Sequence, residues 1–543
     1  MSPTRESDEH PTRGFIMSAD MVLCETASLD ERLFVGHPSI AVRQAYRMAQ
    51  DRYNMLRLPN GESYLSHAER VAAIVLASEG TDLATAGALL HKLDFRLTKK
   101  PPREGREGVT DEQWSRIRGS VNRLEEITQR PFIEFGGRYA VQNYQDMIVN
   151  MCDTPDTMML LLADKLASTT AVMPEEMDGM FQEMRLVWAP LSERLGLYEL
   201  ADGFRDQVFR LGQPGDYRRT LTDVGRMLQE KFGLERDAGE SDEDYYGRLM
   251  SQSRTFLNYI SSGLERRLEE EGIGGRVRFR IKSPYSIWKK LNYTDYETVE
   301  GLPDVFGIEV IYERPEDCQR ILEVINGLND PGTRPKYEYK GPHDPKAYGC
   351  EAYHVDCRIE GIPVEFQVLS RENYMLRETK RSHWQRDLSK REMPGQQFDE
   401  PGEPLTGDFE HDFARIRQRL QQSLYVIYLE GHGRDSVMHP LRLKRGSIPA
   451  DLAALSTIDG LNPRYKGVSK LDLRAGVGIT TAKMVTMSEN YRLCDGDVLT
   501  LNPESHRTTP RLESRLVVGE ILTNAAEPRT RQIIEGIIER QRR

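Results

Sequence analysis

The stretch RVRFRIKSPYSIWKKL, residues 276–291, decides the fold of the central part of the chain. Basic and apolar side chains alternate over residues 276–282, so a β-strand formed here has one basic face and one apolar face. Ser283 and Pro284 follow at once, and these residue types are typical of the N-cap and the first residue of a helix. The stretch therefore predicts a strand that runs directly into a helix.

The basic side chains of this stretch are typical of a site that binds polyphosphate. They lie beside the predicted N-terminus of the helix, where backbone N–H groups and the helix dipole favour anions. No acidic residue stands among them, and the six are Arg276, Arg278, Arg280, Lys282, Lys289 and Lys290. The alternative is a solvated basic strand edge, which discourages pairing with other strands.

Two acidic residues further along the chain favour the phosphate site. Asp304 begins a predicted strand in GLPDVFGIEV, and Glu365 lies on another strand in PVEFQV. Gln367 shares a face with Glu365, because side chains alternate along a strand. A Mg²⁺ ion that bridges phosphates needs one or two carboxylates from neighbouring strands. Each acid alone is more often a surface residue at a strand end, so the prediction depends on their combination with the basic stretch.

Length and composition predict a multidomain globular protein. A chain of 543 residues exceeds one hydrophobic core, and 38% hydrophobic with 29% charged residues is an ordinary globular composition. No apolar run is long enough for a membrane span and no signal peptide is evident, so we expect a soluble, cytoplasmic protein. The six scattered cysteines predict neither a zinc site nor a disulfide framework. A net charge of -11 excludes a whole-surface nucleic-acid binder.

Changes in sequence pattern divide the chain into segments. Helical periodicity fills the first part, and alternating strands with interspersed helices follow, which predicts a multidomain α plus α+β fold with a mixed sheet. The predicted segments are a flexible arm (1–38), a helical domain (39–235), an α+β domain (246–391), a linker with one helix (392–433), a small β-rich module (434–503) and a basic helical tail (504–543).

Three residues of the helical domain suggest a metal site. His67 lies in YLSHAERVA, His91 in ALLHKL and Asp164 in LLLADKLAS. Imidazole and carboxylate groups on helices can hold a divalent metal that activates water. A lone histidine on a helix is usually a capped or core-edge residue, so only the combination favours a metal.

Taken together, these motifs resemble the long RelA/SpoT homologues, which make and break the alarmone (p)ppGpp. The resemblance covers roughly residues 40–510. It implies a helical HD-like hydrolase domain, a nucleotidyltransferase-like synthetase domain with a mixed sheet, and a small β-grasp module of the TGS type. In the family the last of these contacts tRNA during ribosome-linked activation, so tRNA or the ribosome is an implied partner.

The resemblance also implies roles for single residues. The pattern R-x-K-x-x-x-S-I-x-K-K implies that the ATP phosphates bind Arg280, Lys282, Ser286 and Lys290. Asp304 and Glu365 would hold Mg²⁺ and, with Gln367, form the catalytic group. Lys340, Lys346 and His354 keep nucleotide-binding positions of the family. The implied reaction transfers pyrophosphate from ATP to the 3′-hydroxyl of GDP or GTP.

Departures from the family pattern keep other hypotheses open. Glu309 stands where the family has an arginine, and Cys350 where a tyrosine stacks on guanine, with Tyr348 or Tyr353 as a nearby replacement. One alternative is a nucleotide-sensing or tRNA- and ribosome-binding homologue without turnover. Another is a pyrophosphokinase with a different acceptor.

The predicted hydrolase site departs further. Lys92 replaces the aspartate that follows the second histidine of the family, and Phe95 and Arg96 replace an acidic pair. A fixed ammonium group repels a metal cation. We therefore predict that His67, His91 and Asp164 are the vestige of a metal site, with no Mn²⁺ and no hydrolase activity.

Overall fold

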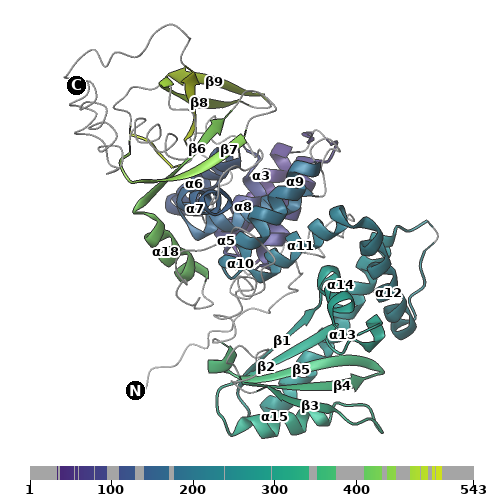
Figure 1. Ribbon diagram of the computed structural model, residues 1–543. Coiled ribbons are helices and arrows are strands. Elements are labelled where there is room, and N and C mark those ends of the chain that lie inside the picture. The colour runs from purple at the N-terminus through teal and green to yellow at the C-terminus, as the bar shows by residue number, and fades with distance from the viewer. Residues whose placement is uncertain are drawn as a thin grey trace, which may run out of the picture.

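The computed structural model of the chain describes residues 34, 37–53, 55–58, 60–78, 80–93, 109–128, 140–169, 177–237, 239–294, 296–340, 351–374, 409–430, 437–447, 465–476, 479–486, 492–495 and 497–503. A group of helices lies in the middle of the molecule, with one mixed sheet on either side of it (Figure 1). The predicted basic tail, most of the predicted arm and the first part of the predicted linker, residues 392–408, fall outside the described residues.

Helices account for the described structure up to residue 270, as the sequence predicts. Threonine and serine side chains cap several of them, and the Ser63 hydroxyl, for example, accepts a hydrogen bond from the backbone N–H of Ser66. The helices are α3 (Ile40–Tyr53), α4 (Tyr64–Ala77), α5 (Asp82–Leu90), α6 (Asp111–Thr128), α7 (Ala140–Met151), α8 (Pro155–Ser168), α9 (Met177–Glu183), the π-helix η4 (Met184–Trp188), α10 (Ala189–Arg194), α11 (Tyr198–Gly212), α12 (Pro214–Phe232) and α13 (Asp242–Glu270).

Helix α8 forms the centre of the helical region. Its sequence, PDTMMLLLADKLAS, is apolar on nearly every side, and such a helix must be buried. It packs against α4, α5, α6 and α11. Asp164 is one of its few buried polar residues, so this carboxylate lies inside the helical region rather than on its surface.

The first sheet contains the predicted strands. Its order is β1-β2-β5-β4-β3, with β2 and β5 parallel and the other neighbours antiparallel. The predicted mixed sheet is therefore confirmed, although the short edge strand β3 was not predicted. The elements are β1 (Gly275–Ile281), α14 (Pro284–Tyr293), the 3-10 helix η5 (Val299–Gly301), β2 (Phe306–Tyr312), α15 (Asp317–Asn326), β3 (Lys336–Lys340), β4 (Ala352–Ile359) and β5 (Ile362–Ser370).

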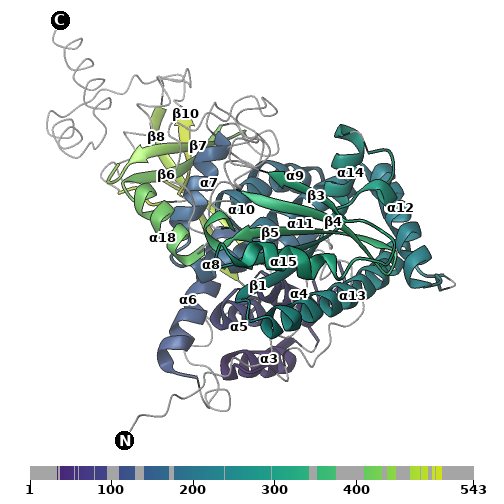
Figure 2. The same ribbon diagram turned by 90° about the horizontal axis from the view of Figure 1, so that it is seen from below.

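The two faces of this sheet differ in chemistry. Helices α13 and α15 lie along one face, where Leu264 and Ile321 join Val310 and Phe366 in one buried core (Figure 2). Residues directly opposite one another in neighbouring strands place their side chains on the same face. The strand register therefore places the polar side chains of all five strands together on the other face.

A second sheet follows the helix α18 (Phe409–Leu420). Its strand order is β7-β6-β10-β8-β9, and the first and last strands along the chain, β6 and β10, are parallel neighbours. This order is compatible with the predicted β-grasp module, whose assignment to the TGS type stays a prediction. The strands are β6 (Ser423–Glu430), β7 (Val437–Lys444), β8 (Tyr465–Gly476), β9 (Ile479–Thr486) and β10 (Val498–Pro503).

The second sheet begins earlier than the predicted boundary at residue 434. Its first strand, SLYVIYLE, starts at Ser423 and supplies buried Tyr425 and Ile427. Both residues belong to the same apolar core as the helices of the N-terminal region. The interpretation of 392–433 as a linker with a helix overlooked this aromatic and β-branched run, which favours a strand.

Hydrogen bonds fasten this sheet to α7. The side-chain amides of Asn143 and Asn150 donate to the backbone carbonyls of Pro440 and Leu420, at 2.9 and 3.1 Å. Asp146 on the same helix, 4% exposed, forms an ion pair with Arg194. The Tyr425 hydroxyl lies 3.3 Å from the other oxygen of that carboxylate.

We expect Arg194→Ala to lower the free energy of unfolding by about 3 kcal/mol, since it leaves the Asp146 carboxylate buried without its cation. The shift of the urea midpoint, followed by circular dichroism, measures this effect. Arg219→Ala, which removes an exposed arginine on α12, should leave the midpoint unchanged. A midpoint equal in both variants would contradict a stabilising role for the buried pair.

Among the described helices, none is both long and apolar enough to cross a membrane.

Candidate functional site

Two lysines and one aspartate form the most concentrated charge cluster of the central region. Lys282 follows β1, Lys290 lies on α14, and Asp304 precedes β2. The ammonium groups of both lysines donate to the same carboxylate oxygen, Oδ2 of Asp304. Ser283 caps α14 as predicted, and this sharp strand-to-helix junction places both lysines against the end of β2. Three of the predicted site residues are thereby brought together.

Charge and burial shift the pKa values of this cluster. Burial alone would raise the pKa of Asp304, but the ammonium groups of Lys282 and Lys290 lower it to about 2. Burial lowers the pKa of Lys282 to about 8, assisted by the charges of Lys290 and Arg280 and opposed by Asp304. Asp304 is therefore ionised at neutral pH.

Both lysines bond to one oxygen of the Asp304 carboxylate and leave its other oxygen without a donor among the described residues. That oxygen, Oδ1, is buried. A buried acceptor without a donor is costly, and a hard divalent cation such as Mg²⁺ would satisfy it. This oxygen therefore fits the predicted Mg²⁺ site.

Glu365 lies on the polar face of β5, held on both sides. The Nδ1 atom of His354 on β4 lies 3.0 Å from Oε1, and the Gln367 amide donates to Oε2 at 2.6 Å. An ionised carboxylate only accepts, so Nδ1 of His354 carries the proton. Burial would raise the pKa of Glu365, but the bonds from His354 and Gln367 lower it to about 2. Three further predicted residues thus form a second group.

A third acid, Asp356, belongs to the same face and was not predicted. It is the direct partner of Glu365 in the β4–β5 register. Burial raises its pKa, and the charges of Glu365 and Asp304 raise it further, against Lys336 and His354. The signal that could have found it is the alternation in YHVDCRI, where His354 and Asp356 share a face.

Arg280 lies on the polar face over a glycine. The two residues are opposite each other in β1 and β2, and a Cβ atom built on Gly307 would lie 3.4 Å from the Arg280 Cγ atom. The glycine therefore gives the arginine side chain room above the sheet. Two residues along the register, on the same face, Arg278 is opposite Glu309. The acidic residue that stands where the family has an arginine therefore has an arginine of this chain as its neighbour.

The predicted use of the helix N-terminus is wrong in one respect. The first backbone N–H groups of α14 are already bonded within the protein. Those of Tyr285 and Ser286 donate to the side chains of Asp206 and Ser283, and that of Ile287 donates to the Ser283 carbonyl. Phosphates at this site would therefore depend on side-chain cations rather than on backbone amides.

Other predicted residues are placed away from the site or not described. Tyr353 lies on the opposite face of β4 and its ring contacts Tyr339, so it cannot stack on a base held over the polar face. Ser286 faces Ser283, with their hydroxyl oxygens 3.2 Å apart. Lys340 ends β3 with a side chain outside the described residues, where Lys346, Tyr348 and Cys350 also fall.

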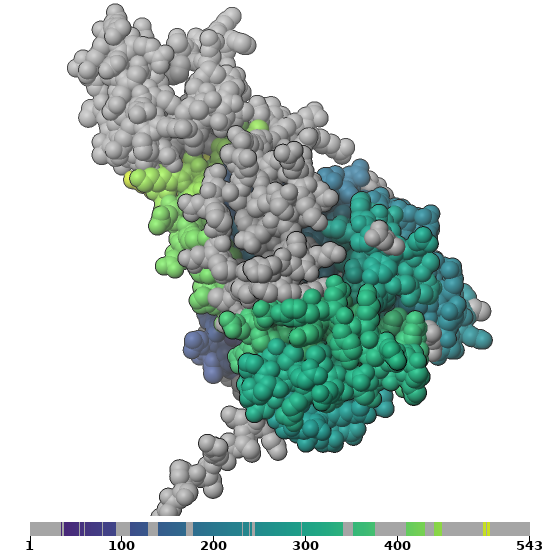
Figure 3. Space-filling view, turned by 60° about the horizontal axis from the view of Figure 1, so that its bottom comes forward, coloured from purple at the N-terminus to yellow at the C-terminus, as the bar shows by residue number. Residues whose placement is uncertain are grey.

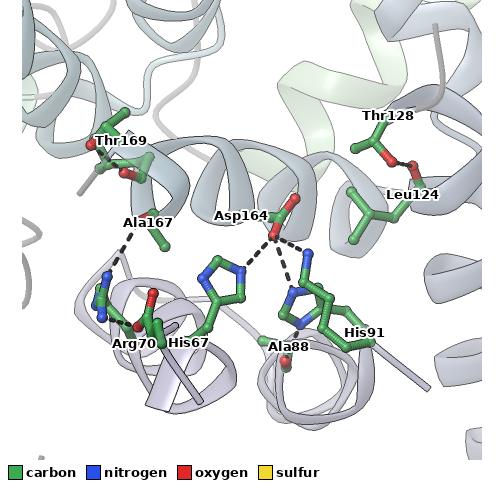
Figure 4. Close-up of polar contacts among 12 residues, drawn as sticks. His67, Arg70, Ala88, His91, Leu124, Thr128, Asp164, Ala167 and Thr169 are labelled. Atoms are coloured by element: carbon green, nitrogen blue, oxygen red, sulfur yellow. Dashed lines mark hydrogen bonds and ion pairs between the residues drawn. The ribbon is translucent and has the colours of Figure 1, made fainter. Parts of the chain in front are cut away.

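The three predicted residues of the helical domain do meet. His67 on α4, His91 at the end of α5 and Asp164 on α8 converge in the interior (Figure 4). One oxygen, Oδ1 of Asp164, lies 3.0 Å from Nε2 of His67 and 3.1 Å from Nε2 of His91. The ligand atoms of all three lie within 4.8 Å of one another and could hold a metal ion. The predicted absence of Mn²⁺ is therefore not confirmed.

The position of the proton on the His91 ring determines what can lie between this ring and Asp164. Its Nδ1 atom lies 2.6 Å from the Ala88 carbonyl oxygen, which only accepts, so Nδ1 carries the proton of the neutral ring. Burial lowers the pKa of His91, as does the charge of Lys92. The neutral ring then directs the Nε2 lone pair at the Asp164 carboxylate. Two acceptors facing each other at this distance favour a cation between them.

Lys92 brings a cation of its own. Its Nζ atom lies 3.2 Å from the same Oδ1 atom of Asp164. Although burial would raise the pKa of Asp164, the charge of Lys92 and the hydrogen bond with His67 hold it well below its ordinary value. Burial lowers the pKa of His67 to about 4, again with a contribution from Lys92. The site therefore has one carboxylate, two neutral imidazoles and one fixed ammonium.

Comparisons with known protein families identify two regions. Residues 279–386 match the model of the region found in RelA/SpoT proteins. Residues 45–198 match an HD domain. One part of the chain therefore matches an HD domain and another matches the region found in RelA/SpoT proteins, and the two clusters described above lie one in each. In the view of Figure 3, teal and green atoms, which include the described part of the second region, lie together on one side of the molecule.

Curated relatives are distant and longer. A guanosine-3′,5′-bis(diphosphate) 3′-pyrophosphohydrolase of Aquifex aeolicus is 23% identical over 483 residues, which cover 86% of this chain and 62% of the relative. The GTP pyrophosphokinase rsh of Brucella ovis is 25% identical over 292 residues, 52% of this chain and 34% of the relative. The chain thus spans about a third to three-fifths of the relatives it matches.

Among the solved structures that match, one contains a bound product. It is the small alarmone synthetase 1 from Bacillus subtilis bound to its product pppGpp, 15% identical, which covers 32% of this chain and 85% of its own. Its TM-score of 0.21 is too low to carry an argument about fold.

Proposed function

We propose that the central region is a pyrophosphokinase that transfers pyrophosphate from ATP to the 3′-hydroxyl of GDP or GTP. The observation that carries the proposal is the pair of lysines held on Asp304, beside the Glu365 group, inside the region that matches RelA/SpoT proteins. A polyphosphate and its metal need such a combination of cations and carboxylates.

Asp304 pairs with the two lysines that would bind the ATP phosphates in the proposed complex. Lys282 and Lys290 are engaged by Asp304, so in the proposed complex they turn to the ATP phosphates, and Asp304 and Glu365 hold Mg²⁺ instead. Bound Mg²⁺ neutralises charge on the transferring phosphates. Arg280, which extends over Gly307, adds a guanidinium that suits phosphate oxygens.

The proposed reaction forms no covalent bond between the protein and its substrates. The acceptor 3′-oxygen attacks the β-phosphorus of ATP, the bond from that phosphorus to the α–β bridging oxygen breaks, and AMP leaves. The proton of the acceptor hydroxyl passes to solvent or to a carboxylate of the polar face. Positioning by Lys282, Lys290 and Arg280 supplies most of the rate.

A labelled-substrate assay tests the proposal. The protein is incubated with γ-labelled ATP, Mg²⁺ and GDP, GTP, AMP or tRNA in separate reactions, and the products are separated by chromatography. Label on a guanine nucleotide supports the proposal. Label on another acceptor would keep the chemistry and change the substrate. No transfer, even with tRNA and ribosomes added, would favour the alternative of a nucleotide-sensing or tRNA- and ribosome-binding protein.

The proposal assigns no hydrolysis to the HD domain. Its support is Lys92, whose ammonium lies on the one carboxylate that a metal needs there. The triad His67, His91 and Asp164 fits a metal by its donor atoms, so the proposal depends on competition by Lys92 and not on a missing ligand. Release of pyrophosphate from ppGpp with Mn²⁺, lost on His91→Ala, would overturn it.

The proposal also gives the second sheet a role in binding tRNA or the ribosome. The support for this role is the parallel pairing of β6 and β10 at the centre of a five-stranded sheet, an order that a β-grasp module has. Product formation that rises when tRNA or ribosomes are added would favour it.

A further inference from the structure

A buried carboxylate outside the central sheet bonds to the helix that carries Lys290. Asp206 on α11 accepts a hydrogen bond at 2.7 Å from the backbone N–H of Tyr285, in the first turn of α14. Asp206 is 4% exposed. A carboxylate at the N-terminus of a helix satisfies a donor that has no partner within the helix. Its negative charge also interacts favourably with the positive end of the helix dipole.

Ring contacts strengthen the same junction. Phe209, on α11 and 3% exposed, has its ring centroid 5.0 Å from that of Trp288 and 6.0 Å from that of Tyr285. Both partners are residues of α14. A polar bond and an aromatic cluster, one turn apart on α11, thus fix the first two turns of α14.

The position of α14 matters because of what it carries. Lys290 lies two turns along this helix, and Lys282 immediately precedes its cap. Both ammonium groups converge on Asp304 at the start of β2. A shift of α14 would therefore move Lys290 relative to Asp304, and misplacement by about 1 Å can cost two orders of magnitude in a reaction that depends on positioning.

We propose that Asp206 is a positioning residue of the ATP site, which acts through α14. It lies outside both matched regions, 45–198 and 279–386, so neither match assigns it a role. The inference rests on the proposed function, because it assumes that the lysines bind ATP phosphates. It extends the site to α11, a helix whose sequence contains no phosphate-binding motif.

The test measures ATP binding and turnover separately. Full-length Asp206→Ala is expected to raise both the KM for ATP and the Kd for Mg²⁺ with α,β-methylene-ATP about tenfold, because one charged hydrogen bond is lost. The kcat at saturating ATP should also fall, by about tenfold, because Lys290 positions the transferring phosphates. Loss of folded protein alone would instead lower kcat and leave KM and Kd unchanged.

Further variants of α11 keep the test decisive. Asp206→Asn retains an oxygen acceptor and should recover most of the affinity, and Phe209→Leu, which keeps an apolar side chain, should raise Kd severalfold. Asp202→Ala is the matched control, since this acid lies one turn earlier and pairs with Arg205. It should behave as wild type.

The outcomes separate the inference from the proposed function. Wild-type protein that binds the analogue but makes no product would refute the proposed function, and the Kd comparison would still decide the role of Asp206. Wild-type affinity in both Asp206→Ala and Phe209→Leu would refute the positioning role. Absence of analogue binding by the wild type would overturn both.

Discussion

Asp304→Asn is expected to reduce product formation at least about a thousandfold in the labelled-ATP assay. The substitution keeps the size of the side chain but removes the charge that Lys282 and Lys290 share. It also replaces one of the two carboxylate oxygens by an NH2 group, so the two lysines and a magnesium ion can no longer each bind an anionic oxygen. Loss of one electrostatic contact to a reacting group commonly costs two to three orders of magnitude, and here metal and lysines are affected together.

The matched control for Asp304 is Glu338→Gln. Glu338 is an exposed acid of the same sheet face, paired with His354 in the β3–β4 register. We expect its turnover to stay within threefold of wild type. Circular dichroism and the urea midpoint show whether Asp304→Asn still folds. Turnover of Asp304→Asn within tenfold of wild type would contradict the proposed magnesium site.

Lys92→Asp is expected to increase the affinity of the HD domain for Mn²⁺ at least about a hundredfold. It replaces a cation 3.2 Å from the Asp164 carboxylate by a second carboxylate, so repulsion becomes attraction. The Nε2 atoms of His67 and His91 already lie 3.0 and 3.1 Å from Oδ1 of Asp164, which is close to the distance between two ligand atoms of one metal ion. The signal of free Mn²⁺ in electron paramagnetic resonance, without nucleotide, measures the occupancy.

Two variants attribute the new site to the HD domain. Lys92→Asp combined with His91→Ala should lose the added Mn²⁺. Lys92→Met should remove the repulsion without adding a ligand, so its affinity for Mn²⁺ should lie between those of the wild type and Lys92→Asp. We expect no hydrolysis from Lys92→Asp alone, because Phe95 and Arg96 still replace the family's acidic pair. Tight Mn²⁺ binding by wild type, lost on His91→Ala, would contradict the competition by Lys92.

Local signals explain what could be predicted from the sequence. The alternation over 276–282 and the Ser283-Pro284 cap are properties of neighbouring residues, and the strand, the helix and the basic face follow from them. The shared face of Glu365 and Gln367 follows from the same alternation. The triad of His67, His91 and Asp164 was predicted from the family resemblance, because nothing local links three helices.

Long-range pairing explains what could not be predicted. The bond from His354 to Glu365 depends on the register of β4 against β5, and Asp356 belongs to the site for the same reason. Asp206 and Tyr285 are 79 residues apart, and no local pattern connects a carboxylate on α11 with the cap of α14. The helix N-terminus was predicted as an anion site because Asp206, the acceptor for one of its N–H groups, was not visible in the local sequence.

The clamp of Lys282 and Lys290 on Asp304 has a consequence for selectivity. Because Asp304 already balances part of the charge of the two lysines, a bare polyanion is attracted less strongly, and it would have to displace the carboxylate while bringing no counterion for it. A nucleotide that arrives with its metal exchanges one set of ion pairs for another at nearly constant charge. The site should therefore discriminate between metal-loaded nucleotides and the far more abundant phosphates of RNA.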